Sequence, residues 1–262
     1  MESRRRLARP IRLRGRALFA GGPASVSIFP GAAERGWRWA VGAGPFEALK
    51  PEQRLAAGRR STLAGRARAD TCEHLLAALL LADIDDCDIR FHEGEAPILD
   101  GSAEPWLRAI RHAGVLGHHG THSLRIGVRW AGRAVSWMAD QAPTKSGLSA
   151  GDKLTGSQIG SARTFIQQGE GSGLQKDGVF PGARPGCALV LAEKGNSALY
   201  GGRPRLLNEP LCHKLLDVLG DLAPWRAQGR LQGELWLDNP GHASNGPAIA
   251  AALGDGRLTF AP

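Results

Sequence analysis

Hydrophobic and polar residues alternate in several short stretches of the first half of the chain, a pattern typical of β-strands with one buried face. The stretches that predict strands are 7–13, 24–29, 37–41 and 85–91. Pro10 interrupts the first of them and cannot donate a hydrogen bond to a neighbouring strand, so we expect an edge strand there. Residues 43–69 are rich in Gly, Ala and Arg without a clear period, which predicts a loop with short strands.

The second half shows the same alternation, and four helices are predicted from apolar residues spaced three and four apart. The predicted strands are 124–128, 134–138, 187–192 and 231–237. The predicted helices are 70–81, 102–113, 208–222 and 247–253. Asp70 and Glu73 have the spacing of a capping box at the start of the first helix. Ser102 stands where an N-cap would stand, with Pro105 in the first turn.

Strands and helices are mixed in both halves, which predicts an α+β fold. A polar connector that contains Gly117, Gly120 and three histidines separates the halves, so we expect one domain over residues 1–119 and a second over residues 120–262. Histidine clusters can bind metal, but a solvated linker is the simpler interpretation of His118, His119 and His122. We find no sequence repeat that would prove a duplication.

The chain has 262 residues, with 33 Lys and Arg against 25 Asp and Glu. An excess of positive charge favours an anionic partner, either a phosphorylated substrate, a membrane surface or nucleic acid. The arginines are scattered and not gathered in one tail, so we expect no nucleic acid and leave open a transient contact with a membrane surface. The hydrophobic content of 42% is sufficient for a buried core.

The cysteines indicate the compartment. Four are present, at positions 72, 87, 187 and 212, and no two form a CxxC pair. We interpret them as buried thiols in a reducing compartment. No apolar run has the length of a membrane span, and no apolar segment follows Arg4-Arg5-Arg6 as in a secretory signal. We therefore expect a cytoplasmic protein.

A polar stripe lies along the third predicted helix. His213, Asp217 and Asp221 are four residues apart, so their side chains share one face. A His and a carboxylate at this spacing can chelate zinc. Taken alone, the stripe is more simply explained as a solvated helix face with a His–Asp pair. Glu73 and His74 have ordinary explanations too, as a capping residue and as a core or surface histidine. The glycine-rich stretches of the second half do not match a phosphate-binding loop.

Five motifs occur in order along the chain. They are Thr71-x-Glu73-His74-Leu75, Pro97-Ile98-Leu99-Asp100-Gly101-Ser102-Ala103, Ala162-Arg163-Thr164-Phe165, His213-Lys214-x-Leu216-Asp217-x-x-Gly220-Asp221 and Gly241-His242-x-x-Asn245. Together they resemble the zinc-dependent UDP-3-O-acyl-N-acetylglucosamine deacetylases of the lipid A pathway, over residues 7–253. The resemblance implies two α+β domains of similar topology, whose helices pack together between the two sheets. It places the active site between the domains.

The resemblance also implies the roles of ten residues. Zinc would be bound by His74, His213 and Asp217, with the fourth position open for water, as in catalytic zinc sites. The roles in catalysis would be general base for Glu73, cationic general acid for His242, orientation of that acid for Asp221 and oxyanion binding for Thr164. The substrate, a UDP-linked acylated N-acetyl sugar, would contact Lys214, Phe165 and Leu18. We expect a monomer.

Several substrate-shaping parts depart from the family pattern. Phe19 stands in place of the family histidine, Ala17 in place of a glycine, and Ile166 in place of another glycine. The segment 119–162 is shorter than usual, and the glycine-rich stretch 169–186 lacks the amphipathic pattern of the family's acyl tunnel. A divergent member with a complete catalytic set fits these features. Two alternatives are a deacetylase of another N-acetylated amino sugar and a catalytically silent homologue that binds polyanions.

Overall fold

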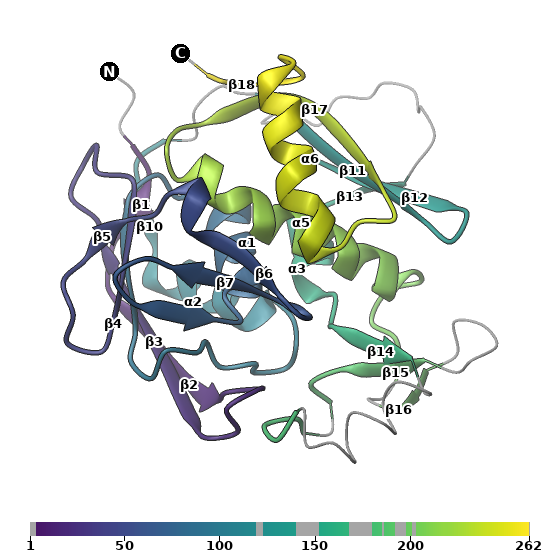
Figure 1. Ribbon diagram of the computed structural model, residues 1–262, viewed down its shortest axis with the longest axis horizontal. Coiled ribbons are helices and arrows are strands. Elements are labelled where there is room, and N and C mark those ends of the chain that lie inside the picture. The colour runs from purple at the N-terminus through teal and green to yellow at the C-terminus, as the bar shows by residue number, and fades with distance from the viewer. Residues whose placement is uncertain are drawn as a thin grey trace.

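Two five-stranded sheets with helices between them form the body of the protein (Figure 1). The computed structural model describes residues 4–118, 123–139, 152–167, 180–184, 186–191, 198–200 and 203–261. The predicted α+β class, with helices layered between sheets, is confirmed. Of the connector histidines, only His118 belongs to the described residues. Most of the glycine-rich stretch 169–186 lies outside them.

The sheet of the first half has the strand order β2-β3-β9-β4-β5. Its strands are β2 (Ile11–Arg16), β3 (Pro23–Pro30), β9 (Cys87–Phe91), β4 (Trp37–Val41) and β5 (Glu47–Ala48). The strands β4 and β9 run parallel, and the other neighbours are antiparallel. The first predicted strand is divided at Pro10 into β1 (Arg6–Leu7), which pairs with β10 (Val115–Leu116), and β2. As predicted, β2 lies at an edge.

The sheet of the second half has the order β13-β12-β11-β17-β18. Its strands are β13 (Asp152–Leu154), β12 (Arg133–Ala139), β11 (Leu124–Trp130), β17 (Leu231–Asp238) and β18 (Leu258–Phe260). Here too a parallel pair, β11 with β17, lies inside the sheet. A small third sheet contains β14 (Phe165–Gln167), β15 (Leu189–Leu191) and β16 (Ala198–Tyr200).

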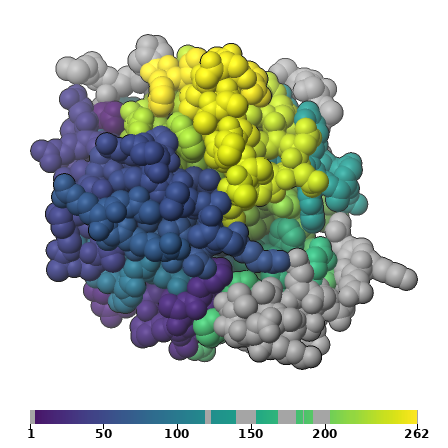
Figure 2. All heavy atoms as spheres, viewed as in Figure 1, coloured from purple at the N-terminus to yellow at the C-terminus, as the bar shows by residue number. Residues whose placement is uncertain are grey.

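The segment without a clear period, residues 43–69, is more ordered than expected. Besides β5 and a 3-10 turn (Pro51–Gln53), it forms a three-stranded antiparallel sheet of β6 (Arg54–Ala57), β7 (Arg60–Ala64) and β8 (Arg68–Asp70). The arginines and glycine of this segment obscure the alternation of apolar and polar residues. The small sheet also packs against other elements as well as facing solvent, so its strands do not have one buried and one exposed face. Figure 2 shows its side chains, in blue, in contact with the yellow α6 (His242–Gly254).

Three predicted helix starts are wrong by a few residues. The first helix, α1 (Glu73–Leu81), begins after Asp70, which ends β8 and accepts from the Thr62 hydroxyl instead of capping. The capping-box interpretation of Glu73 therefore fails. The second helix, α2 (Glu104–Ala113), starts just after Ser102, whose hydroxyl still accepts from the Glu104 amide. The last helix begins at His242, ahead of the predicted start at residue 247, and its N-cap is Gly241.

The helix α5 (Glu209–Arg226) runs through the centre of the molecule beside α1 (Figure 1). A short helix, α3 (Gly156–Ser161), packs near their contact. Residues on every side of α1 are buried, because one side of this helix faces the first sheet and the other faces α5. All four cysteines are buried free thiols, as predicted. None of the helices in the described part of the chain is long and apolar enough to span a bilayer.

A glycine permits the close approach of these two central helices. A Cβ atom at Gly220 of α5 would lie 2.3 Å from the carbonyl oxygen of Glu73 at the start of α1. Real side-chain atoms do not tolerate this distance from backbone, so any larger residue would force the helices apart. Gly220 thus fixes how closely the first turn of α1 faces the polar stripe of α5.

Substitution Gly220→Ala should therefore destabilise the protein, even though alanine favours helices. Overpacking of this kind costs about 1–3 kcal/mol of unfolding free energy. Urea unfolding followed by circular dichroism measures it. The matched control is Gly254→Ala at the end of α6, where a Cβ meets nothing within 4 Å. Equal stability of the Gly220 variant and the wild type would contradict this account of the helix contact.

Candidate active site with a metal-ligand cluster

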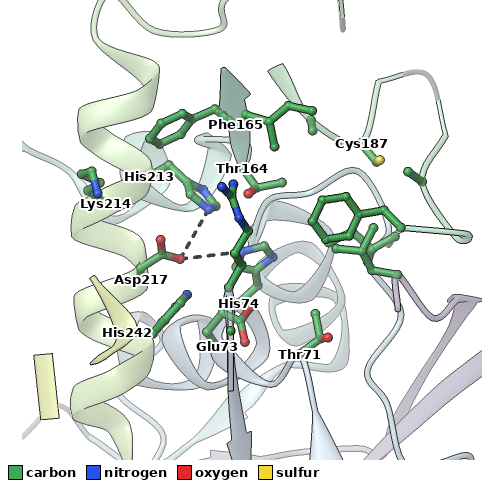
Figure 3. A pocket seen from close by; sticks show the side chains of 18 of the residues that line it. Thr71, Glu73, His74, Thr164, Phe165, Cys187, His213, Lys214, Asp217 and His242 are labelled. Atoms are coloured by element: carbon green, nitrogen blue, oxygen red, sulfur yellow. Dashed lines mark ion pairs between the residues drawn. The ribbon is translucent and has the colours of Figure 1, made fainter. Parts of the chain in front are cut away.

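A pocket of about 440 Å³ opens where the two halves of the chain meet. It is lined by the first turn of α1, the polar stripe of α5, the segment before β14, the tip of the β6–β7 hairpin and the start of α6. Nine of the ten residues to which the sequence assigned a role line this pocket, as Figure 3 shows for most of them. The tenth, Asp221, lies directly behind His242.

His74, His213 and Asp217 form the centre of the pocket. Each offers one ligand atom, and these atoms all lie within 4.8 Å of one another. The Asp217 Oδ1 atom is 3.4 Å from His213 Nε2 and 3.9 Å from His74 Nε2, the pairs joined by dashed lines in Figure 3. Both histidines are buried, whereas the Asp217 side chain is 21% exposed on the pocket side. The arrangement is that of a metal site made of two imidazoles and one carboxylate.

Hydrogen bonding and burial prepare both imidazoles for ligation. His213 Nδ1 lies 2.9 Å from the Ala162 carbonyl oxygen, which can only accept, so Nδ1 carries a proton and Nε2 is the nitrogen available for ligation. Burial, together with the neighbouring His213, holds the pKa of His74 well below its usual value. Neutral imidazoles are the form that binds a metal ion.

Glu73 lies beside this cluster on the first turn of α1. Its Oε2 atom accepts from the backbone amide of Ser61 at 3.1 Å, and the side chain is buried. Burial, with the nearby carboxylates of Asp217 and Asp221, raises the pKa of Glu73 to about 7, although His242 opposes the shift. A carboxylate with a pKa near neutrality is suited to accept a proton and later return it.

His242 and Asp221 form a second functional unit. His242 Nδ1 lies 3.0 Å from Asp221 Oδ2, and the Asp221 carboxylate is fully buried. Burial alone would lower the pKa of His242, but the charges of Asp221, Asp217 and Glu73 and the hydrogen bond to Asp221 together outweigh it and raise this pKa to about 10. Burial would raise the pKa of Asp221, but the charges of His242 and Arg54 and the hydrogen bonds from His242 and Ser61 together lower it. The pair therefore consists of an imidazolium bound by a carboxylate, and the imidazolium can donate a proton at neutral pH.

The remaining predicted residues line the walls of the pocket. The Thr164 amide donates to the Gly101 carbonyl at 2.7 Å, which fixes the segment that carries its hydroxyl. Lys214 Nζ donates to the Pro240 carbonyl at 2.8 Å and lies over the rings of Trp130 and Phe165. Burial lowers the pKa of this lysine. Leu18 and Phe165 add apolar surface to the same cavity.

Several residues of the site were missed from the sequence. Arg54 and Ser61 contact Asp221, and both come from the segment that showed no period. Asn245 was part of a motif but had no assigned role, and its side chain donates to Asp221 at 2.8 Å. No local signal could have identified Arg54 or Ser61, because their partner lies in the other half of the chain.

Phe19, which replaces the family histidine, also lines the pocket. Its ring packs edge-on against Phe180, with centroids 5.2 Å apart, and the Arg60 guanidinium lies 3.9 Å from its centre. The backbone amides of Phe19 and Ala20 donate to the buried carboxylate of Glu95. The loop is therefore anchored, and phenylalanine in place of histidine makes this wall of the pocket more apolar.

Comparison with known proteins gives the same relationship as the motifs. The UDP-3-O-acyl N-acetylglycosamine deacetylase family matches residues 4–130 and 144–253. The UDP-3-O-acyl-N-acetylglucosamine deacetylase of Anaeromyxobacter dehalogenans is 28% identical over 275 aligned positions, which cover 97% of this chain and 88% of the relative. The enzyme of the same name from Thermosynechococcus vestitus is 31% identical over 191 positions, 62% of each chain.

A third relative is the bifunctional enzyme LpxC/FabZ of Chlorobaculum tepidum, 29% identical over 231 positions. The alignment covers 69% of this chain and 48% of that enzyme, so the chain spans about half the length of this relative. The family match itself extends over most of the chain and includes every residue of the pocket discussed above. The chain belongs to the UDP-3-O-acyl N-acetylglycosamine deacetylase family.

Proposed function

We propose that this chain is a zinc-dependent deacetylase that removes the N-acetyl group of a UDP-3-O-acyl-N-acetylglucosamine and releases acetate, a step of lipid A biosynthesis. The observation that carries the proposal is the convergence of a two-histidine, one-carboxylate cluster with Glu73 and the His242–Asp221 pair in one pocket. The names of the relatives support the substrate.

The donor set fits a zinc ion. Two imidazoles and a carboxylate satisfy its preference for nitrogen and oxygen ligands, and three protein ligands leave a position open. A zinc ion held there would polarise the acetyl carbonyl and acidify a water molecule. The hydrogen bond from His213 to the Ala162 carbonyl supports the fit, because it holds the ligating nitrogen toward Asp217.

The protein's own groups would then move the protons. Glu73, with a pKa near 7, takes a proton from the attacking water. His242 is protonated at neutral pH and donates its proton to the departing sugar nitrogen, which would otherwise be a poor leaving group. The Thr164 hydroxyl donates toward the oxyanion that forms at the acetyl carbon. Lys214 contributes a cation for the anionic part of the substrate.

We further propose that the pocket lies between a domain of residues 1–119 and one of residues 120–262, since both ranges contribute lining residues. The buried free thiols support a reducing, cytoplasmic location. A monomer remains our prediction for the state in solution, and transient contact with a membrane surface is consistent with the net charge of +8.

The purified protein should bind one zinc ion per chain. A chelator should remove this ion and abolish acetate release, and added zinc should restore it. In His213→Ala and Asp217→Ala, zinc measured by atomic emission should fall well below one per chain. His92→Ala, outside the pocket, is the control and should keep full zinc. Stoichiometric zinc in the His213 and Asp217 variants would rule out this ligand set.

Glu73→Gln keeps the shape of the side chain and removes its basicity. The kcat of acetate release should fall by about 10²–10⁴, the usual contribution of a general base, while zinc content is retained. Glu52→Gln, at a carboxylate whose side chain is 69% exposed, should behave as wild type. A Glu73→Gln enzyme with near-normal kcat would show that another group accepts the proton.

The activity should depend on pH through His242. Because its pKa is raised to about 10, the donor proton is present at neutral pH and is lost only as the pH rises through that value. Asp221→Asn removes the largest of the charges that raise this pKa, so the alkaline limb of kcat/KM should move to lower pH by about 1–3 units. Asp88→Asn, whose carboxylate pairs with Arg38 outside the pocket, should leave the limb unchanged. If the alkaline limb of kcat/KM does not move in Asp221→Asn, the titration of His242 is not the cause of that limb.

A further inference from the structure

Arg54 connects the two halves of the chain at the His242–Asp221 pair. It is the first residue of β6, in the N-terminal half, and its side chain is 5% exposed. Its Nε atom donates to Asp221 Oδ1 at 3.0 Å, and its Nη2 atom lies 2.8 Å from Asp221 Oδ2. The same Nη2 donates to the main-chain carbonyl of His242 at 2.6 Å. The Arg54 guanidinium therefore binds both the Asp221 carboxylate and the backbone of His242.

The Asp221 carboxylate is fully satisfied by groups from both halves. From the N-terminal half it accepts from Arg54 and from the Ser61 hydroxyl. From the C-terminal half it accepts from Asn245 and His242. A buried carboxylate with this many donors cannot rotate without breaking charge-assisted hydrogen bonds. The orientation of the His242 ring therefore depends in part on Arg54 and Ser61, which belong to the N-terminal half of the chain.

The helix that carries His242 is shaped to admit this guanidinium. A Cβ atom at Gly246, in the second turn of α6, would lie 2.7 Å from Arg54 Nη1. Glycine inside a helix is destabilising relative to alanine. The destabilising glycine of α6 therefore stands at the position where the Arg54 side chain passes the helix. In the space-filling view of Figure 2, the side chains of α6, in yellow, lie against the blue region that contains β6.

We propose that Arg54 is a positioning residue for the general acid: it fixes the ring of His242 by holding Asp221 and the His242 carbonyl together. The inference rests on the proposed function, in which His242 donates a proton to the departing nitrogen. A planar fork with fixed donors can hold both acceptors at once, which a lysine ammonium on a flexible stem cannot reproduce. Misplacement of a catalytic group by about 1 Å can cost on the order of 100-fold in rate.

The test uses the zinc-loaded enzyme and acetate release from the UDP-linked acylated sugar. Arg54→Met and Arg54→Lys should lower kcat by about 10- to 100-fold, with less loss in the lysine variant, which keeps the charge. KM and zinc content should stay within about twofold of wild type, since Arg54 contacts none of the three proposed zinc ligands in the described residues. Arg68→Met, a side chain 53% exposed on the same small sheet, is the control and should change nothing.

A second background separates positioning from general support of the fold. In His242→Ala the acid is absent, so adding Arg54→Met should lower kcat less than twofold further. A full additional loss in that background would overturn the proposal, as would unchanged kcat in the single variants or a fall in zinc content that matches the fall in kcat. If Arg54→Met does not fold, Arg54→Lys decides by the same criteria.

The failure of this inference differs from the failure of the proposed function. A zinc-loaded wild type that releases no acetate from the UDP-linked substrate would refute the function and the inference together. An active wild type with Arg54 variants of normal kcat would refute the positioning role alone.

Discussion

The contact between α1 and α5 is the constraint on which the rest of the structure depends. Gly220 lets the backbone of α5 lie against the Glu73 carbonyl, at a distance that no side chain would permit. The first turn of α1 then faces the polar stripe of α5, so His74 meets His213 and Asp217. Both helices are buried on nearly all sides, which makes the contact rigid. The ligand cluster is therefore a consequence of core packing and does not depend on a loop.

Burial and charge pairing then divide the chemistry among similar side chains. The Glu73 carboxylate accepts from the Ser61 backbone amide, and burial raises its pKa to about 7 although His242 opposes the shift, which suits the proposed role of base. Asp221 is equally buried, but cations and hydroxyl donors surround it, so its pKa is lowered and it remains an anion. That anion keeps His242 protonated. Two carboxylates of the same site thus suit different proposed roles, because Asp221 is hydrogen-bonded directly to Arg54 and His242, whereas Glu73 accepts from a backbone amide.

The sequence predicted the parts of the fold that depend on local pattern. Alternation located the longer strands of both large sheets but not the short edge strands β5, β13 and β18. Helical spacing placed His213 and Asp217 on one face of α5. It gave the wrong interpretation of Glu73, because a base and a capping residue look alike at a helix start. That residues from both halves meet at one site was predicted only through the family resemblance of the five ordered motifs. Arg54 lay beyond prediction, since its partners are distant in the chain and its own strand shows no period.

The central claim is that the start of α1 and the stripe of α5 share one metal ion. Anomalous X-ray diffraction from crystals, measured on both sides of the zinc absorption edge, tests it most directly. The account predicts a single strong peak about 2.0–2.2 Å from His74 Nε2, His213 Nε2 and a carboxylate oxygen of Asp217. A peak at any other group of side chains, with none between these three residues, would contradict it.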